Sequence, residues 1–278
     1  PTGVYRTNFT LPKGWKERRT VIHFGGVESA FFVFCNGNQV GFGKDSRTPV
    51  EFDLSSWIKT GKNQLTVIVV RWSDGSFLED QDHWWMAGIH RSVYLRSTGK
   101  TFLEDMFPRA ELNQGLDSGS LDVEARVKFA GQAEVGWKVG IQLIDPEENH
   151  VFPSMPVEEI PLAEQTRINL GHLIRIYKKV KNPRLWSSET PNLYTVLICL
   201  FDPSGNEVEW TSCKIGFRRI EIKNREMLIN GMPVLIYGVN RHEHDPVNGK
   251  TVSRESMLED VLLMKQYNFN AVRCSHYP

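Results

Sequence analysis

The chain has 278 residues, and its 33 lysines and arginines balance 33 aspartates and glutamates, so the formal net charge is zero. A neutral chain without a basic run gives no electrostatic reason to expect a nucleic-acid or anionic-membrane partner. No stretch approaches the roughly 18 apolar residues that predict a membrane helix. The length is enough for two domains, or for one domain with parts of others.

The first 98 residues read as a succession of short β-strands. Turn residues at 36–38 and 61–63 separate some of the apolar runs,. Strands are predicted at Arg19–Phe24, Ala30–Cys35, Gln39–Phe42, Val50–Leu54, Gln64–Trp72 and Val93–Leu95. No helical period longer than Ser55–Ile58 occurs, which favours an antiparallel jelly-roll sandwich over residues 1–98.

A second β-rich region extends over residues 99–217. Its predicted strands include Ser120–Phe129, Gly136–Ile144, Arg167–Leu170, Leu193–Phe201 and Glu207–Ile215. Roughly seven strands in about 115 residues, separated by polar turns, are typical of an immunoglobulin-like sandwich.

The pattern changes from residue 218 onward. Ile220–Val234 is predicted to form a hairpin that turns at Asn230-Gly231. The apolar run Val234–Val239 predicts a strand buried on both faces, as in parallel sheets.

A helix and a second strand are predicted to follow. Ser253 is placed to cap the helix, with Glu255 in its first turn and Lys265 in its last,. The helix would have an apolar face of Met257, Leu258, Val261, Leu262 and Met264,. Asn268–Asn270 would end it, and a strand would begin at Ala271. This β–α–β order predicts the opening of a TIM barrel over residues 218–278.

The four cysteines are predicted to be buried and reduced. Cys199 and Cys213 lie on two arms of one predicted hairpin, where Cys213 falls opposite a residue near Val196. Cys199 is about three positions along the strand from that residue. The Cα atoms of the two cysteines would therefore be farther apart than a disulfide tolerates, roughly 7 Å. There is no CxxC spacing for zinc. A reducing, cytoplasmic location is therefore expected.

The chain starts at Pro1 without an initiator Met or a signal pattern, and the barrel pattern stops after two strands,. We expect an internal piece of a longer protein. It would lack the N-terminal part of the first sandwich and most of the barrel.

Polar, titratable residues follow both predicted barrel strands. His242 and Glu243 come after the first strand, and Arg273 and His276 belong to the end of the second. The carboxyl ends of TIM-barrel strands carry the active site. A single histidine there would more often cap a strand, but two histidines and an arginine at matched strand ends favour a functional site. Zinc binding by His242 and His244 is not expected, because the pair lacks a helical HExxH frame.

Residues 71–86 combine four carboxylates with three of the eight tryptophans. Such a segment either binds sugar, through aromatic faces and carboxylate hydrogen bonds, or plugs the edge of a domain, and composition favours neither. Asp80 with Asp82, or Glu79 with Glu243, could be considered as a glycosidase acid and nucleophile, but spacing alone establishes neither pair.

Several motifs together resemble the β-galactosidases of glycoside hydrolase family 2. The resemblance covers essentially the whole chain, and the family order of jelly roll, immunoglobulin-like sandwich and TIM barrel agrees with the pattern. The matching runs are Pro1–Gly3, Cys35–Gly37, Asp45–Arg47, Glu51–Leu54, Arg71–Ser76, Leu78–Asp82, Asn192–Tyr194, Gly238–His244 and Phe269–Pro278.

The resemblance implies retaining hydrolysis of terminal β-D-galactosides such as lactose, through a covalent galactosyl-enzyme. In the family both catalytic glutamates lie on later barrel strands, which implies that neither is in this chain and that Glu79 and Glu243 are not those residues. The 278 residues alone are therefore expected to be inactive.

The resemblance also assigns supporting roles. Asp82 matches the aspartate that reaches into the galactose subsite and helps to hold Na⁺. His242 and His276 match the histidines that hydrogen-bond sugar hydroxyls as the transition state forms. Arg273 matches the arginine that pairs with the nucleophilic glutamate and keeps it ionised.

Magnesium is the second ion that the resemblance implies, with its main ligands outside this chain. Asp74 resembles an outer Mg²⁺ ligand. Lys44 stands where well-known relatives have a neutral glutamine, and its charge would repel the ion, so this outer site is not expected.

Two alternatives stay open. Related β-glucuronidases have Asn-Lys-His-Glu-Asp where this chain has Asn240–His244, and this difference, with Cys274, favours a galactosidase. A non-catalytic carbohydrate-binding or scaffold protein is the other alternative. The complete protein is expected to bind a galactoside, to form a homo-oligomer, and to have no nucleic-acid or membrane partner.

Overall fold

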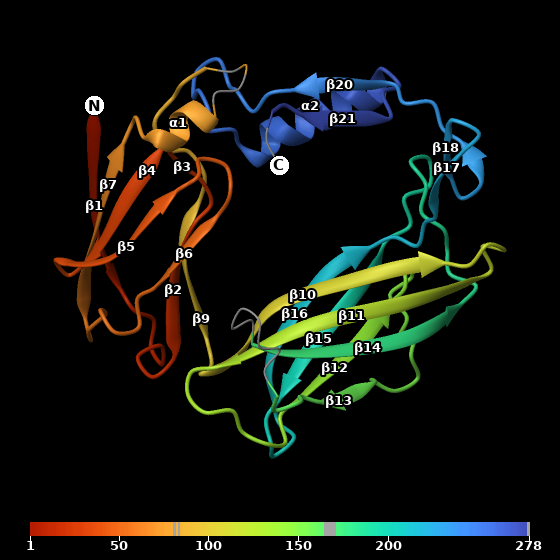
Figure 1. Cartoon of the computed structure of the whole chain (residues 1–278), viewed down its shortest axis with the longest axis horizontal. Helices are drawn as coiled ribbons and strands as arrows, with labels where there is room; N and C mark the ends of the chain where they lie inside the picture. Colours follow the sequence, from red (N-terminus) through yellow and green to blue (C-terminus); the bar gives the residue numbers. More distant parts are fainter. Residues whose placement is uncertain (80–81, 83, 164–170, 277–278) are drawn as a thin grey trace. The chain divides into compact units, whose positions relative to one another are not determined.

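The computed structural model describes residues 1–79, 82, 84–163 and 171–276. The predicted strand Arg167–Leu170 and the candidate carboxylate Asp80 lie outside the described residues. The chain divides into two compact units, a first unit of residues 1–98 and 236–278 and a second unit of residues 99–235 (Figure 1). The domain boundaries expected at 98/99 and 217/218 stay predictions.

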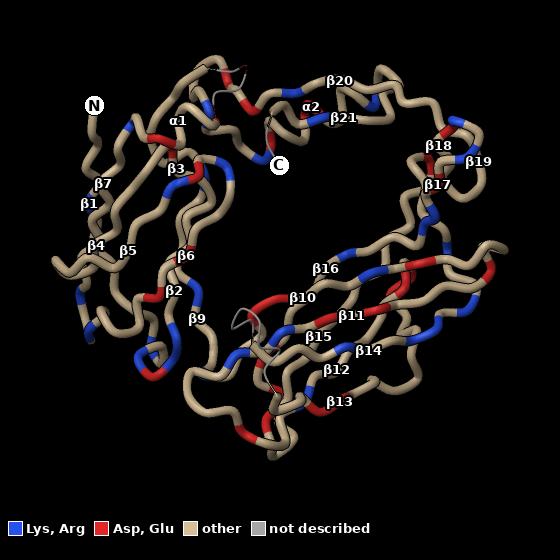
Figure 2. The backbone as a smooth tube through the Cα atoms, in the orientation of Figure 1, with Lys and Arg blue, Asp and Glu red and all other residues tan. Residues whose placement is uncertain are grey.

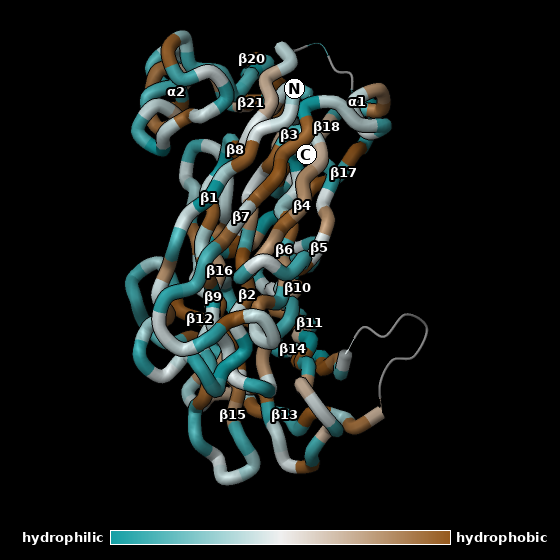
Figure 3. Tube along the Cα trace, turned by 90° about the vertical axis from the view of Figure 1, so that its left-hand side faces the viewer, coloured by the Kyte–Doolittle hydropathy of each residue, from teal (hydrophilic) through white to brown (hydrophobic). Residues whose placement is uncertain are grey.

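The first unit contains an antiparallel β-sandwich of the jelly-roll class. One sheet has the order β1 (Thr2–Thr10), β7 (Lys62–Val70), β4 (Ala30–Cys35), β5 (Asn38–Lys44), and the other β6 (Val50–Asp53), β2 (Arg19–Phe24), β9 (Val93–Thr98). A short pair, β3 (Val27–Glu28) and β8 (Gly88–Ile89), lies beside them. Alternate residues of β4 and β7 are buried between the sheets, and both strands are largely hydrophobic in Figure 3,. The core of this sandwich is made of Ile22, Phe24, Val27, Phe31, Val33, Cys35, Leu54, Leu65, Val67 and Val69.

The strand predictions in this region are right for β2 and β4 and miss β1. All residues of β1 are exposed except Gly3 and Phe9, which are half-buried, so the strand carries no apolar alternation to detect,. The predicted turn at Asn36-Gly37 is confirmed, with φ of 52° and 85° in the left-handed region that a tight hairpin requires,. The expectation of no helix longer than Ser55–Ile58 is wrong. That segment is a turn, and a five-residue helix α1 (Asp74–Leu78) forms instead, started by hydrogen bonding between Ser73 and Ser76.

The second unit contains a sandwich of the immunoglobulin-like class, with seven strands among its described residues. One sheet has the order β10 (Thr101–Leu112), β11 (Ser118–Phe129), β14 (His172–Lys181). The other has the order β13 (Val157–Glu159), β12 (Lys138–Ile144), β15 (Tyr194–Phe201), β16 (Glu207–Ile215). Fully buried Val, Ile and Leu residues from both sheets fill the space between them. The predicted strands in β11, β12, β15 and β16 are confirmed, whereas β10, β13 and β14 were not predicted.

The register of β15 and β16 explains why no disulfide forms. Cys213 lies opposite Val196 and Cys199 opposite Trp210, as the hairpin count predicts. All four cysteines are free, and burial raises the pKa of Cys199 to about 12. The expectation that all four are buried is wrong, because Cys213 is only half-buried and Cys274 is exposed on a strand edge.

A three-stranded sheet ends the second unit. It consists of β17 (Ile220–Lys223), β18 (Glu226–Ile229) and β19 (Met232–Pro233). The turn predicted at Asn230-Gly231 is confirmed, and a second turn at Asn224-Arg225 makes two hairpins where one was expected.

The predicted β–α–β unit is confirmed in the first unit. β20 (Gly238–Arg241) pairs in parallel with β21 (Ala271–Cys274), and α2 (Arg254–Gln266) connects them. The side chain of Ser253 accepts a hydrogen bond from Ser256 N at 3.2 Å, as a helix N-cap does,.

The extent and burial of the first barrel strand were predicted wrongly. The strand starts at Gly238, four residues later than expected, and Leu235, Ile236 and Tyr237 are exposed. A strand is buried on both faces only where neighbouring strands and helices cover it. Among the described residues β20 has only β21 beside it, and α2 has no buried residue.

Charged residues of both signs are interspersed over each unit (Figure 2). In the described part of the chain, neither the length nor the hydropathy of any helix would let it cross a membrane.

The outer face of β11 carries one buried acid, and this gives a pH prediction. Asp122 is 8% exposed and accepts hydrogen bonds from Arg175 at 2.6 and 2.7 Å and from Arg109 at 2.7 Å. The Arg175 and Arg109 guanidinium groups lower the pKa of Asp122 from 3.8 to about 2. The ionised acid therefore stabilises the fold above about pH 4, and this contribution is lost as the pH falls through 2.

We expect Asp122→Asn to remove about 1–2 kcal/mol of unfolding free energy at pH 7 and little at pH 2. The expected loss of unfolding free energy is small for a buried acid because Arg175 is 62% exposed and water screens the pair,. Urea unfolding at both pH values measures the difference. Glu158→Gln, at an exposed position of β13, is the control. Equal losses at pH 7 and pH 2 would show that Asp122 acts by packing alone.

Candidate functional site

The carboxyl ends of β20 and β21 bring the two predicted histidines together. The parallel register places Asn240 beside Arg273, and Ser275 N donates a 2.8 Å hydrogen bond to Arg241 O, which extends the pairing. The rings of His242 and His276 lie edge to face, with centroids 5.2 Å apart. The predicted meeting of these histidines at one edge is therefore observed, while their chemical role stays a prediction.

Arg273 lies at the same edge with most of its hydrogen-bonding capacity free. Its Nη1 makes two long contacts, 3.4 Å to Asn240 Oδ1 and 3.3 Å to Ser275 Oγ. Neither Nε nor Nη2 donates to a partner among the described residues. A guanidinium has five N–H donors in a fork that matches a carboxylate, so Arg273 can still bind one.

Asp82 is exposed and makes no hydrogen bond or ion pair with any described residue, so its place in the sugar subsite stays a prediction. The same tryptophan-rich segment does reach the histidine loop through Trp84, whose ring lies edge to face with His244 at 5.2 Å. Burial, and then Lys250 and His242, lower the pKa of His244.

The contacts between the sandwich and the loop after β20 were not predicted from the sequence. Arg91 Nη2 donates to Glu243 Oε2 at 3.2 Å, and the ammonium group of Lys250 pairs with Glu28 on β3. Both side chains of the second pair are almost completely buried, with 3% and 4% exposure. These partners are 152 and 222 residues apart in the chain, and a sequence without a fold gives no signal for such a pairing.

The other candidate carboxylate, Glu79, is hydrogen-bonded to Ser46. It accepts hydrogen bonds from Ser46 N at 3.0 Å and from Ser46 Oγ at 2.5 Å. With Glu243 held by Arg91, both carboxylates are engaged by neighbouring groups.

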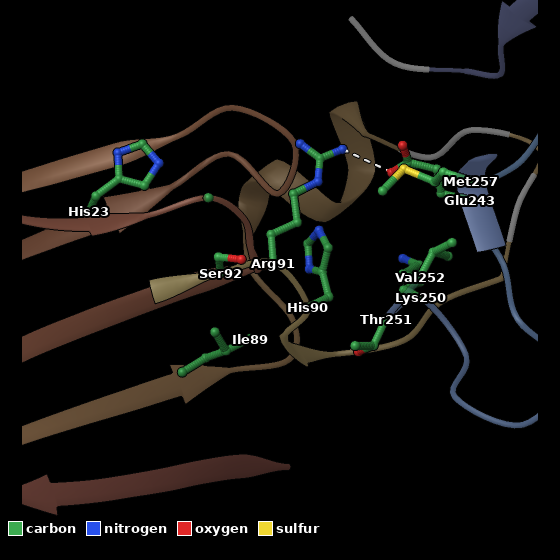
Figure 4. Close-up of a pocket in the computed structure, with 11 residues that line it drawn as sticks. His23, Ile89, His90, Arg91, Ser92, Glu243, Lys250, Thr251, Val252 and Met257 are labelled. Carbon is green, nitrogen blue, oxygen red and sulfur yellow. Dashed lines mark hydrogen bonds and ion pairs between the residues drawn. The ribbon is translucent and has the colours of Figure 1, made fainter. Parts of the chain in front are cut away.

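A cavity of about 500 Å³ lies between the sandwich and the β20–α2 loop (Figure 4). The Arg91–Glu243 pair lies along its edge, with His90 close to Arg91. The cavity is lined by His23, Gly25, Ile89, His90, Arg91, Ser92, Glu243, Lys250, Thr251, Val252 and Met257.

His90 is the unusual group of this cavity. Both ring nitrogens are buried without a hydrogen bond of normal geometry to the described residues. A Cβ atom at Gly26 would lie 2.7 Å from His90 Nε2, so the ring packs directly on the glycine backbone. Burial, reinforced by the positive charges of Arg47 and Arg91, lowers the pKa of His90 from 6.5 to about 4. The imidazole is therefore neutral at pH 7.

We expect this histidine to weaken the fold in mild acid. Between about pH 6.5 and 4 the unfolded chain binds a proton at residue 90 that the folded chain does not. The free energy of unfolding should fall by up to about 3 kcal/mol over this range. His90→Phe should abolish that dependence and raise stability at pH 7, because it removes two unpaired polar atoms. Urea unfolding from pH 7 to 4 measures this, with exposed His150→Asn as control; an unchanged pH slope in His90→Phe would contradict the prediction.

Asp74 and Asp82, the expected ligands of Mg²⁺ and Na⁺, differ in their surroundings. Lys44 Nζ lies 2.7 Å from Asp74 Oδ2, and this contact, followed by Gly75 N, lowers the pKa of Asp74. A magnesium ion at Asp74 would have to displace the ammonium group, so these residues do not fit the ion. Asp82 offers one exposed carboxylate to Na⁺. No group of three or more His, Cys, Asp or Glu gathers around a common point within the described ranges.

Sequence comparison places this arrangement in a known family. Three profiles of one family match in succession: the glycosyl hydrolases family 2 sugar-binding domain over residues 1–99, the family 2 domain over 101–218, and its TIM barrel domain over 220–278. The chain belongs to glycosyl hydrolases family 2. Its jelly-roll sandwich, immunoglobulin-like sandwich and barrel opening follow the order of those profiles.

Curated relatives cover the whole of this family 2 chain. It is 43% identical over 278 residues to a β-galactosidase of Photobacterium profundum and 45% identical over 282 residues to one of Psychromonas ingrahamii. The alignments include 100% of this chain but 26% and 27% of those relatives. The chain thus spans about a quarter of their length.

Solved structures confirm the fold. The Bacteroides uniformis β-glucuronidase matches with a TM-score of 0.87 and 23% identity, over 100% of this chain and 34% of that one. A β-glycosidase from Bacteroides vulgatus matches with a TM-score of 0.84 and 24% identity, over 100% and 34%. At this identity the likeness concerns the fold alone.

Proposed function

We propose that this chain is part of a retaining β-galactosidase that hydrolyses terminal β-D-galactosides such as lactose. The observation that carries the proposal is the edge formed by His242, His276 and Arg273, on a chain 43–45% identical throughout to proteins named β-galactosidase. Retaining hydrolysis requires a carboxylate nucleophile and an acid/base about 5–5.5 Å apart. We propose that both come from a part of the protein outside these 278 residues.

The residues of this chain would bind sugar and stabilise charge. The edge-to-face pair of His242 and His276 would present ring N–H donors to sugar hydroxyl groups at one edge of the sheet,. Arg273, whose Nε and Nη2 have no partner in the described part of the chain, would hold the nucleophilic carboxylate in its ionised form,. Asp82 would approach the sugar from the sandwich.

The residues of this chain that could bind an ion are carboxylates. Na⁺ would be held in part by Asp82 and would supply a positive charge near a sugar hydroxyl. Asp74 is left out as a magnesium ligand because Lys44 already neutralises it. A homo-oligomeric state and a cytoplasmic location are proposed for the complete protein on the same basis.

Hydrolysis of a chromogenic β-galactoside tests the function. We expect the complete protein to hydrolyse it, and the 278-residue chain to be inactive because it lacks both carboxylates. A chromogenic β-glucuronide is the matched control substrate, because the solved structures similar to this chain include a β-glucuronidase and a putative β-galactosidase. Faster cleavage of the glucuronide would establish the glucuronidase alternative. Complete inactivity toward both would favour a carbohydrate-binding protein, and activity of the short chain would show that its own carboxylates are sufficient.

A further inference from the structure

Arg91 connects the sandwich to the loop that carries His242. It lies between β8 and β9, and its guanidinium makes two contacts in different directions: Nη1 donates to Arg47 O at 2.7 Å and Nη2 to Glu243 Oε2 at 3.2 Å. Figure 4 shows the side chain extending along the cavity toward Glu243. Arg91 and Glu243 are 30% and 28% exposed, so the pair is partly shielded from water. An arginine fork held at two points restricts the position of Glu243 more than a single surface ion pair would.

The side chains of both neighbours of His242 are held by ion pairs. Arg241 Nε donates to Asp260 Oδ2 of α2 at 2.7 Å, and Glu243 is held by Arg91. His242, between them, faces His276 and lies 6.0 Å from His244, ring to ring. Residues 242–244 form a tight turn after β20, in which His244 N donates a 3.0 Å hydrogen bond to His242 O. Holding the side chains of residues 241 and 243 therefore restricts the backbone on both sides of His242, and with it the direction of the ring.

The far end of the loop is held by the same sandwich. Lys250 pairs with Glu28, whose strand β3 pairs with β8, directly before His90 and Arg91. A positive φ at Gly249 brings its backbone against Met86. Glu243 itself pairs with Arg91 of the sandwich through Oε2, and Arg241 Nη1 lies 4.0 Å from its Oε1.

We propose that Arg91 is a positioning residue of the sugar site: by holding Glu243, it keeps the His242 ring in the orientation that receives the substrate. This inference rests on the proposed function. Misplacement of a transition-state contact by about 1 Å costs on the order of 100-fold in rate. The loss should appear in kcat more than in KM, because His242 is proposed to act as the transition state forms.

A double-mutant cycle in the complete protein tests the coupling between Arg91 and His242, which do not touch. We expect Arg91→Met to lower kcat/KM for a β-galactoside by about 10- to 100-fold in the wild-type background. In a His242→Asn background the same change should cost less than about twofold, since there is no ring left to position. Arg96→Met, which removes another arginine–glutamate pair of the sandwich, is the matched control and should change neither value. Equal losses in both backgrounds, or no loss in either, would overturn the proposal.

A second readout does not depend on activity. In protein labelled with ¹⁵N-histidine, Arg91→Met should shift the His242 ring signals, identified by their disappearance in His242→Asn, while Arg96→Met should not. An unmoved His242 signal would overturn the role of Arg91 even if hydrolysis fell. A wild-type protein without galactosidase activity would reject the proposed function, and the histidine spectrum would still decide whether Arg91 sets the ring.

Discussion

Replacing Lys250 by methionine is expected to lower the free energy of unfolding of the first unit by about 3–5 kcal/mol at pH 7. The substitution leaves the Glu28 carboxylate buried at 4% exposure without its cation. Removing one partner of a buried pair costs the desolvation of the other, which the remaining structure cannot compensate. Urea unfolding measures the global loss, and hydrogen exchange of residues 27–29 and 242–252 shows whether the loop opens first.

A matched pair and a double variant make this prediction specific. Lys44→Met removes an ammonium group from the exposed pair with Asp74, and should leave stability close to that of the wild type,. Glu28→Gln combined with Lys250→Met should recover most of the loss, because no unpaired charge remains. If Lys250→Met lowered stability as little as Lys44→Met, the Lys250–Glu28 pair would not hold the far end of the loop.

Replacing Arg273 by methionine is expected to lower kcat/KM of the complete protein on a β-galactoside by about 10²–10³-fold. Losses of this size follow the removal of one preorganised charge or donor from a reacting centre. The acid limb of the pH profile should also move. Without the cation the pKa of the nucleophilic carboxylate rises by about 1–3 units, so the ionised form appears only at higher pH. The pH dependence of kcat/KM measures this shift.

Arg254→Met is the control for Arg273, because it removes an exposed arginine at the start of α2, on the same β–α–β unit. It should leave both the rate and the acid limb unchanged. Arg273→Lys should recover part of the rate, since an ammonium group keeps the charge but not the two-point geometry. A large rate loss in Arg273→Met with an unmoved acid limb would mean that Arg273 binds substrate and does not control the carboxylate.

Apolar alternation was sufficient where strands face a core on one side. β2, β4 and β16 have the predicted bounds. Along most of β4 and β16 burial alternates with the period of two that a half-buried strand requires, whereas in β2 Thr20, Val21 and Ile22 are buried in succession,. β1 was missed because almost nothing in it is buried. The tight hairpin turn at Asn36-Gly37 and the cap at Ser253 were predictable because they depend on residues only a few positions apart.

The candidate site was predictable at the strand ends and not beyond them. His242, Arg273 and His276 could be placed together because parallel strands end at the same edge of a sheet. Arg91 and Lys250 could not, since their partners are 152 and 222 residues away and only the folded sandwich brings them near. The burial of β20 and α2 was predicted wrongly for a related reason, because an apolar run does not specify which other strands and helices pack against it.

By itself, the sequence determined the mainly β architecture, the β–α–β opening and the two histidines and the arginine that follow its strands. These are consequences of side-chain period and of local turn and cap chemistry. Only the tertiary structure decided how the loop after β20 is held, that both ring nitrogens of His90 are buried without a hydrogen bond of normal geometry to the described residues, and that the Lys44 ammonium group lies against Asp74. Such pairings depend on which surfaces meet when the chain folds, and burial then sets how strongly each charge acts.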